Sequence, residues 1–135
     1  MLFRSLSNLR GLSNAITSDT DIHDLIQESP QDANLSLLTA GPMPPAPGRL
    51  LSSNKMRSLL QDMGHEYDLV ICDAPPVVFA DAKLTAEHTD GVLMVVGVGK
   101  TDRVQVLQAL TDLKSNAQSP VLGIEIGRAS CRERV

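Results

Sequence analysis

Asp73 is the residue of this sequence whose type and position are best suited to chemistry. It directly follows the apolar run at residues 69–72, and after Ala74 come two consecutive prolines, Pro75 and Pro76. If the run is a buried strand, a carboxylate at its end is costly to desolvate unless a partner such as a hydrated divalent cation compensates it. The prolines have no N–H to continue a strand, so the chain has to leave the sheet there. This pattern indicates a metal-binding carboxylate, and a residue that only caps the following turn is the alternative.

A second candidate is the string Gly-Val-Gly-Lys-Thr at residues 97–101, which ends like a phosphate-binding loop. The complete pattern also needs a glycine five residues before its second glycine, and that position is Met94, inside an apolar run. A run of apolar side chains leaves no loop of backbone N–H groups to surround a phosphate. We therefore predict that Thr101 caps the helix that follows and that the Lys100 side chain is solvated.

Cysteine and histidine residues form no recognisable site. Cys72 and Cys131 give neither a disulfide framework nor a metal-binding spacing. Cys72 lies in the apolar run before Asp73, so we interpret it as a small buried hydrophobic residue. The three histidines are far apart in sequence, lack HxxxH-type spacing and are predicted to lie at the surface; they are His23, His65 and His88.

The composition is typical of one globular domain with an aliphatic core. The chain has 135 residues, 42% of them hydrophobic, which is enough for one core and too few to expect two. Aromatic residues make up 2% and the formal net charge is −4, so neither a stacking platform nor a basic footprint for nucleic acid is expected. No apolar run approaches the roughly 18 residues that span a bilayer. We therefore predict a cytoplasmic domain.

Short apolar runs alternate with longer amphipathic ones, and this order predicts the elements that must position Asp73. Strands are expected at residues 34–40, 68–72, 91–98 and 120–124, and helices at residues 12–16, 21–27, 49–63, 81–89 and 102–116. Asp21 is expected to cap the second helix. The last helix has four apolar residues on one side, Val104, Leu107, Leu110 and Leu113. The alternation predicts an α/β fold with a parallel sheet covered on both faces, whose ligands bind outside the carboxyl ends of the strands.

The last segment, EIGRASCRERV at residues 125–135, does not follow this pattern. It shows neither strand nor helix periodicity, and it resembles, residue for residue, the translation of a common short-read sequencing adapter in one frame. We therefore interpret it as non-native read-through and exclude it from the fold prediction. A basic tail that binds an acidic partner is the alternative.

Several strings occur together in an order that is typical of one protein family. YDLVICDAPPVVFADAKLTAEHTDGVLMVVGVGKT resembles the nucleotide-binding domain of the bacterial tyrosine autokinases (BY-kinases) that control capsule and exopolysaccharide synthesis and export. That family typically has a Tyr-Asp pair, an apolar strand, Asp-Thr-Pro-Pro, an Asp-Ala pair and an Asp-Gly pair. Upstream, NLSLLTAGPMPPAPGRLLSSNKM and GLSNAI look like further family motifs, so the resemblance covers roughly residues 9–124.

The sequence also departs from the family pattern. Ala74 replaces the usual threonine, Ala46 the usual asparagine and Arg49 the usual glutamate. The family's phosphate-binding loop, its Asp-x-Asp motif and its tyrosine-rich tail do not occur in this chain, in which Tyr67 is the single tyrosine.

The resemblance implies a P-loop NTPase-like (Rossmann-like), three-layer fold with a parallel sheet that is incomplete here, because the first strand and the P-loop are missing. Residues 1–124 become a partial kinase domain that runs from after the second nucleotide motif through the Walker B strand. By resemblance, Asp73 is a catalytic residue that binds the nucleotide's Mg²⁺ through water, and Asp81 reaches the nucleotide site through a water molecule. Capping of the helix at residues 81–89 is the alternative for Asp81.

The intact protein that the resemblance implies transfers the γ-phosphoryl group of ATP to protein tyrosines, with Mg²⁺ as cofactor. It forms a homo-oligomeric ring at the inner face of the bacterial plasma membrane and works with a membrane-embedded chain-length regulator, without nucleic acid. The 135-residue chain by itself is expected to be inactive. Two other classes stay open. One is a partition or septum-positioning ATPase, which usually lacks the Ala-Gly-Pro-x-Pro-Pro loop found at residues 40–45; the other is a non-enzymatic module that contacts a polysaccharide-assembly partner.

Overall fold

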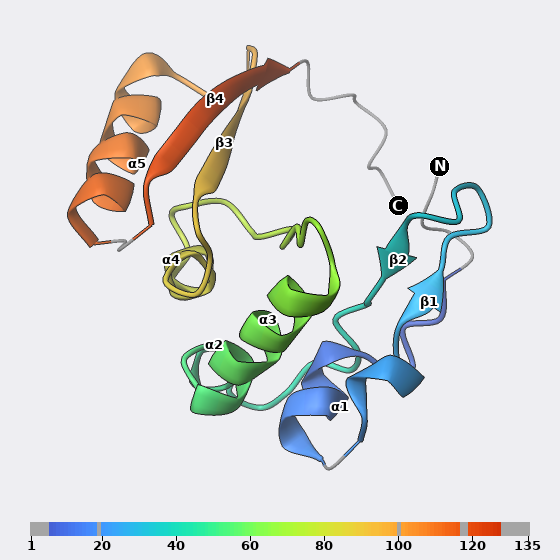
Figure 1. Cartoon of the computed structure of the whole chain (residues 1–135). Coiled ribbons are helices and arrows are strands. Elements are labelled where there is room, and N and C mark those ends of the chain that lie inside the picture. The colour runs from blue at the N-terminus through green and yellow to red at the C-terminus, as the bar shows by residue number, and fades with distance from the viewer. Residues whose placement is uncertain (1–5, 19, 100, 117–118, 128–135) are drawn as a thin grey trace. The chain divides into compact units, whose positions relative to one another are not determined.

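A computed structural model of the chain describes residues 6–18, 20–99, 101–116 and 119–127 (Figure 1). Lys100 and Cys131, which figured in the sequence analysis, lie outside these residues. The chain divides into two compact units, Met1–Ser58 and Leu59–Val135, and the division falls inside helix α3 (Asn54–Glu66). In the described ranges, no helix is long and apolar enough to cross a membrane.

The first unit consists of short elements. Before α3 they are α1 (Leu12–Thr17), the 3-10 helix η1 (Ile22–Asp24), β1 (Gln27–Glu28), β2 (Ser36–Leu37) and α2 (Pro47–Leu51). The helix predicted at residues 12–16 is confirmed as α1. The helix predicted at residues 21–27 is reduced to η1, and Asp21 caps it as expected, because the Asp21 Oδ1 accepts a hydrogen bond from the His23 N–H at 3.0 Å.

The strand predicted at residues 34–40 is mostly absent. Only β2 forms, and it pairs with β1 in the antiparallel direction through Gln27↔Leu37 and Glu28↔Ser36. The prediction that this run joins a parallel sheet is therefore wrong. The reason is competition for its backbone, since the carbonyl oxygens of Thr39 and Ala40 accept hydrogen bonds from the start of α1.

Two glycines allow this close approach between α1 and the chain after β2. The Leu12 N–H donates to the Thr39 oxygen at 2.8 Å, and the Ser13 N–H donates to the Ala40 oxygen at 2.9 Å. A Cβ added to Gly11 would lie 2.1 Å from the Thr39 oxygen and 2.6 Å from the Gly41 nitrogen. Gly41 has φ of 76°, a conformation that residues with a side chain rarely adopt. We call this backbone crossing, made by residues 11–13 and 39–41, the glycine crossing.

The single helix predicted at residues 49–63 is broken into α2 and α3. The N–H of Ser52 donates to the Gly48 oxygen at 3.0 Å and closes α2. Ser53 then opens α3, because its Oγ accepts a hydrogen bond from the Met56 N–H at 3.1 Å. The same hydroxyl donates to the Leu50 oxygen at 2.7 Å, so it satisfies backbone groups of both helices at once. The apolar stripe predicted for this segment is present in α3, where Met56 and Met63 are buried.

Ser53→Ala is expected to lower the free energy of unfolding by about 1 kcal/mol, because Ala at a helix N-cap leaves the first N–H groups without an acceptor. Urea unfolding followed by circular dichroism measures the change. Ser52→Ala is the matched control, since the Ser52 hydroxyl makes only a long contact of 3.5 Å to the Arg49 oxygen. Equal losses in the two variants would contradict the cap assignment.

The second unit contains the end of α3, α4 (Ala80–Ala86), β3 (Val92–Gly97), α5 (Arg103–Asn116) and β4 (Val121–Gly127). β3 and β4 pair in parallel, with Met94 opposite Ile124 and Val96 opposite Ile126. The connection from β3 to β4 runs through α5, so this part is the strand–helix–strand unit that the sequence predicts (Figure 1). The strands predicted at residues 91–98 and 120–124 and the helices predicted at 81–89 and 102–116 are therefore confirmed.

β4 also corrects the sequence-based boundary at residue 124. The strand continues through Glu125 and Ile126 to Gly127, so the expectation that the last segment has no strand is wrong for these three residues. The strand continues because these residues still pair with β3, where Glu125 is opposite Val95 and Gly127 is opposite Gly97. Residues 128–135 lie outside the described part of the chain.

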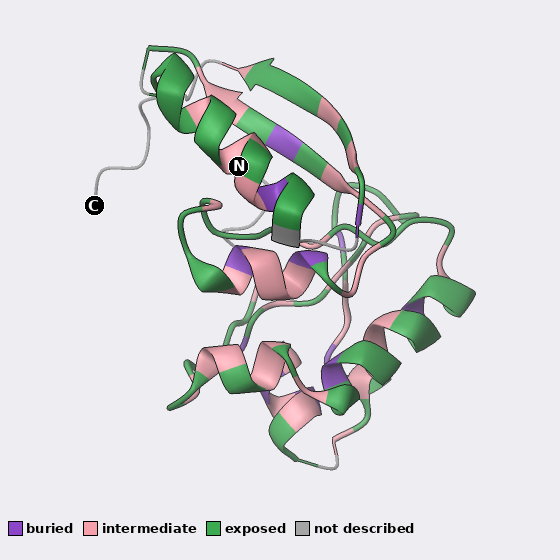
Figure 2. Cartoon of the chain, turned by 90° about the vertical axis from the view of Figure 1, so that its left-hand side faces the viewer, coloured by how far each residue is buried: buried purple, intermediate pink, exposed green. Residues whose placement is uncertain are grey.

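The core of the second unit is small. Its buried apolar residues are Met63, Ala82, Ala86, Met94 and Leu113. Figure 2 shows that most of β3 and β4 is not buried, and Leu93 and Val95 are 64% and 70% exposed. On α5, Val104 and Leu107 are exposed and only Leu113 is fully buried. The prediction of a sheet covered on both faces is therefore wrong for the described residues, because the sheet that forms has two strands and few elements to cover it.

Candidate functional site

Asp73 lies in a segment that is neither helix nor strand, residues 67–76, between α3 and α4. The strand predicted at residues 68–72 does not form, and Leu69 and Ile71 are 74% and 81% exposed. A strand exists only when a neighbour completes its hydrogen bonds, and β3 is paired to β4 rather than to this segment. Asp73 is accordingly exposed. The expectation that it ends a buried strand is wrong, and its carboxylate has not lost the stabilisation that water provides.

The prolines turn the chain as the sequence predicts. The Phe79 N–H donates to the Pro76 oxygen at 2.9 Å and closes a turn that leads directly into α4. This turn is closed by backbone groups three and six residues after Asp73, so capping by the Asp73 side chain is not what forms it. The Asp73 carboxylate therefore lies at the entry of the turn and faces solvent.

Asp81 lies in the first turn of α4 and is half-buried. The N-cap of α4 is Phe79, so the alternative that Asp81 caps this helix is wrong. Its backbone oxygen accepts a hydrogen bond from the Thr85 hydroxyl at 2.9 Å, and its side chain stays available for another partner at the helix start, where the macrodipole stabilises a negative charge. Asp73 and Asp81 are thus at the two ends of one short connection that includes both prolines.

The two carboxylates offer hard oxygen donors, which Mg²⁺ prefers. Within the described ranges, no group of three or more His, Cys, Asp or Glu side chains could hold a metal. Mg²⁺ in phosphoryl-transfer sites keeps several waters and takes one or two carboxylates together with substrate phosphates. The donors present therefore fit a magnesium ion that arrives with a nucleotide, and they do not fit a metal that the protein would hold by itself.

The string at residues 97–101 does not form a phosphate-binding loop in its described part. β3 extends to Gly97, and Met94, at the position where the pattern needs a glycine, is a buried residue in the middle of that strand. The helix that follows is capped by Asp102 instead of Thr101, since the Asp102 Oδ1 accepts a hydrogen bond from the Gln105 N–H at 2.9 Å. The predicted cap is therefore wrong by one residue.

Cys72 is half-buried, and burial raises the pKa of its thiol because the low-dielectric surroundings disfavour the thiolate. A raised pKa suits a structural cysteine and opposes a nucleophilic role at neutral pH. His23 and His65 are exposed, as predicted, whereas His88 is half-buried at the end of α4.

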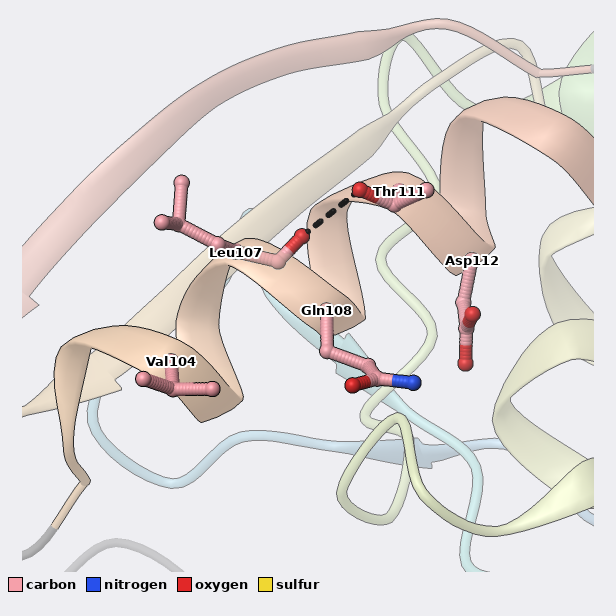
Figure 3. A pocket seen from close by; sticks show the side chains of 5 residues that line it. All are labelled: Val104, Leu107, Gln108, Thr111 and Asp112. Carbon is pink, nitrogen blue, oxygen red and sulfur yellow. Dashed lines mark hydrogen bonds between the residues drawn. The ribbon is translucent and has the colours of Figure 1, made fainter.

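A shallow depression of about 370 Å³ lies on α5 and is lined by Val104, Leu107, Gln108, Thr111 and Asp112 (Figure 3). All five residues belong to one face of the helix, and the Thr111 hydroxyl donates to the Leu107 oxygen at 2.9 Å. Neither Asp73 nor Asp81 lines the depression, so the depression does not include these two carboxylates.

Sequence reasoning missed the contacts that hold α4 in place. Lys83 of α4 forms an ion pair with Asp112 of α5 at 3.3 Å. The buried hydroxyl of Ser119, before β4, donates to the Ala86 oxygen at 2.6 Å and also contacts the Thr89 oxygen. These partners are about thirty residues apart along the chain, and no local pattern in a single sequence connects them.

Comparison with known proteins gives a consistent result. The chain is 35% identical over 119 residues to the tyrosine-protein kinase YwqD of Bacillus subtilis, covering 87% of this chain and 49% of that protein. It is 27% identical over 129 residues to the tyrosine-protein kinase CpsD of Streptococcus agalactiae, covering 95% of this chain and 55% of that protein. The kinase domain of Escherichia coli tyrosine kinase ETK superposes with a TM-score of 0.85 at 26% identity, covering 97% of this chain and 51% of that domain. No family model matches the chain.

The chain therefore spans about half the length of the curated relatives it matches. These similarities confirm the predicted fold class, a P-loop NTPase-like α/β fold with a parallel sheet. They do not favour the two other classes that the sequence left open, a partition ATPase and a non-enzymatic module. Over the length that it spans, the chain is homologous to the kinase domains of bacterial tyrosine-protein kinases.

Proposed function

We propose that this chain is part of an ATP-dependent protein-tyrosine autokinase that regulates capsule or exopolysaccharide synthesis and export. The observation that carries the proposal is the acidic connection from Asp73 to Asp81, which contains the proline turn and leads into α4, in a chain with kinase-domain relatives. Residues 1–124 are then a partial kinase domain, and residues 125–135 are non-native read-through, of which β4 includes the first three.

In this proposal Mg²⁺ neutralises the phosphate charge of ATP during transfer of the γ-phosphoryl group to a tyrosine hydroxyl. Asp73 accepts hydrogen bonds from the water shell of the metal and so orients it, a task that suits an exposed carboxylate at the entry of a turn. Asp81 contributes a second negative charge at the other end of the connection. Catalysis of this kind depends on positioning and electrostatic stabilisation, so the placement of the two carboxylates by the proline turn and α4 is part of the proposed function.

The partners that we propose for the intact kinase are those that the resemblance to the BY-kinases implies. The intact kinase would form a homo-oligomeric ring in the cytoplasm, at the inner face of the plasma membrane, and work with a membrane-embedded chain-length regulator. Its substrates would be protein tyrosines, and it would not need nucleic acid. The formal net charge of −4 supports the last point, because it disfavours phosphate backbones.

The purified 135-residue chain is expected to hydrolyse no ATP and to phosphorylate no tyrosine, because its sequence contains no complete phosphate-binding loop. Phosphate release and phosphotyrosine immunoblotting measure the two activities. ATP hydrolysis that depends on Asp73 in this chain would overturn the prediction.

The experiment that tests the proposed function is recovery of the coding sequence on both sides of this reading frame, followed by an autophosphorylation assay of the protein that it encodes. We expect a phosphate-binding loop and an Asp-x-Asp-x-Arg motif upstream and a tyrosine cluster downstream. A coding sequence without these motifs, or a protein that has them and does not phosphorylate tyrosine, would refute the proposal.

A further inference from the structure

Helix α4 carries Asp81 in its first turn, and it is too short to hold a position by itself. It has seven residues, well below the length at which an isolated helix is stable in water. Its placement therefore depends on contacts with other elements. Two buried alanines, Ala82 and Ala86, face the small core of the second unit but offer little surface for packing.

The carboxyl end of α4 is held by Ser119. The Ser119 side chain is buried, and its Oγ donates to the Ala86 oxygen at 2.6 Å and contacts the Thr89 oxygen. The Ala86 oxygen, at the end of the helix, also accepts hydrogen bonds from the Thr89 N–H at 3.1 Å and from the Thr89 hydroxyl at 3.0 Å, and Thr89 lies in the turn after the helix. One hydroxyl from the α5–β4 connection thus fixes the end of α4 to the sheet.

The same turn is fixed by two neighbouring contacts. The Val92 N–H donates to the Pro120 oxygen at 2.9 Å, directly beside Ser119. Gly91 lies against the Leu122 side chain so closely that a Cβ on Gly91 would be 2.5 Å from it. The residues between α4 and β3 therefore contact the residues around the start of β4, and Ser119 connects the end of α4 to this junction.

The outward side of α4 is held by Lys83. Its Nζ lies 3.3 Å from the Asp112 Oδ2 of α5, and both side chains are partly exposed. An exposed pair of this kind contributes weakly to stability. It joins α4 to α5 at a residue other than those that the Ser119 hydroxyl contacts. Asp112 also lines the depression on α5, and Figure 3 shows its carboxylate extending from the helix.

We propose that Ser119 and Asp112 are positioning residues for Asp81. Together they hold α4 in one orientation, and α4 in turn fixes the direction of the Asp81 side chain and the exit of the proline turn from Asp73. The importance of that direction for phosphoryl transfer rests on the proposed function. The positioning itself is a property of the second unit alone.

The test uses the double variant Lys83→Met, Ser119→Ala in the 135-residue chain. Amide hydrogen exchange and residual dipolar couplings are measured by NMR for α4, α5, β3 and β4. Loss of the buried Ser119 hydrogen bonds should accelerate exchange of the α4 amides by about tenfold. The dipolar couplings of α4 should shrink because the helix samples several orientations, while those of α5 and the two strands keep their values.

The matched control is Lys114→Met, Ser115→Ala. Lys114 is exposed on α5, and the Ser115 hydroxyl donates to carbonyl oxygens of its own helix, to Thr111 at 2.9 Å and Asp112 at 3.3 Å. The control changes the same residue types on the neighbouring element and should leave the α4 couplings unchanged. A charge exchange, Lys83→Asp with Asp112→Lys, should restore the couplings that Lys83→Met alone reduces.

Unchanged α4 couplings in the double variant would overturn the proposal. So would a uniform loss of couplings in all four elements, since that result assigns a general stabilising role to Ser119. If the double variant does not fold, the single variants Ser119→Ala and Asp112→Asn give the comparison for each contact separately. All of these readouts are geometric, so their failure would leave the kinase proposal intact. Failure of the kinase assay would likewise leave the positioning of α4 by Ser119 and Asp112 intact.

Discussion

Asp73→Asn in the complete kinase is expected to lower the rate of tyrosine phosphorylation by about a hundredfold or more, the usual effect of removing one preorganised electrostatic group from a phosphoryl- or acyl-transfer site. The amide keeps the size of the carboxylate and removes its charge, so the water shell of Mg²⁺ loses its orienting acceptor. Transfer of labelled phosphate from ATP at saturating nucleotide, repeated over a range of Mg²⁺ concentrations, measures the effect. Binding of the protein substrate should be unchanged, which places the loss in kcat rather than KM.

Asp68→Asn is the matched control for this variant. Asp68 is an exposed carboxylate near the start of the same segment, so the substitution makes the same change in charge. It should leave the rate within about twofold, since a surface charge away from the site is screened by salt. A kinase that retains full activity with Asn at position 73 would remove Asp73 from the proposed site, and equal losses in both variants would indicate an effect of net charge.

Gly11→Ala is expected to lower the free energy of unfolding of the first unit by about 3 kcal/mol, the upper part of the range for overpacked positions. Gly11 has an extended backbone conformation that any residue can adopt. The loss of stability therefore comes from steric clashes of the added Cβ. The new Cβ would lie 2.1 Å from the Thr39 oxygen and 2.6 Å from the Gly41 nitrogen, and both are backbone atoms that cannot rotate away. The hydrogen bonds from Leu12 and Ser13 across the glycine crossing would separate as a result.

Gly64→Ala provides the control, because a Cβ at Gly64 meets nothing within 4 Å and the residue lies inside α3. There alanine should stabilise the chain by roughly 0.5 to 1 kcal/mol through its higher helix propensity. Urea denaturation monitored by circular dichroism compares the two variants under one set of conditions. Opposite signs are the expected outcome, and a Gly11→Ala protein as stable as the parent would show that the glycine crossing opens easily.

The elements that the sequence predicted correctly are those whose signal is local. The apolar run of β3, the periodicity of α5 and the cap at Asp21 each depend on residues within one turn or one strand. The run at residues 69–72 has the same apolar character as β3, yet it forms no strand, because a strand also needs a neighbour. Pairing is a non-local property, and a single sequence contains no direct record of it.

Competition between local signals explains the smaller differences. The periodicity across residues 49–63 is continuous, but Ser52 and Ser53 supply hydroxyl groups that end one helix and begin the next. In the same way, Asp102 is a stronger cap than Thr101, and α4 begins too early for Asp81 to cap it.

The candidate site was predictable in its residue types and only partly in its environment. Asp73 and the proline turn were found from their order along the chain, because a carboxylate followed by two prolines constrains both chemistry and backbone direction. The exposure of Asp73 was not predicted, since it depends on the missing strand partner. Ser119 could not be found either, because a serine before a proline is common in loops and its long-range bond to Ala86 leaves no sequence signature.

The exposed backbone at residues 67–76 also governs the colloidal behaviour of the chain. Its backbone belongs to neither a helix nor a strand, the side chains of Leu69 and Ile71 are exposed, and those of Leu93 and Val95 in β3 are exposed as well. Such segments lower their free energy by adding to any other extended apolar segment, and in a concentrated solution the most abundant one belongs to another copy of the same chain. Self-association of this chain is therefore expected to increase with protein concentration.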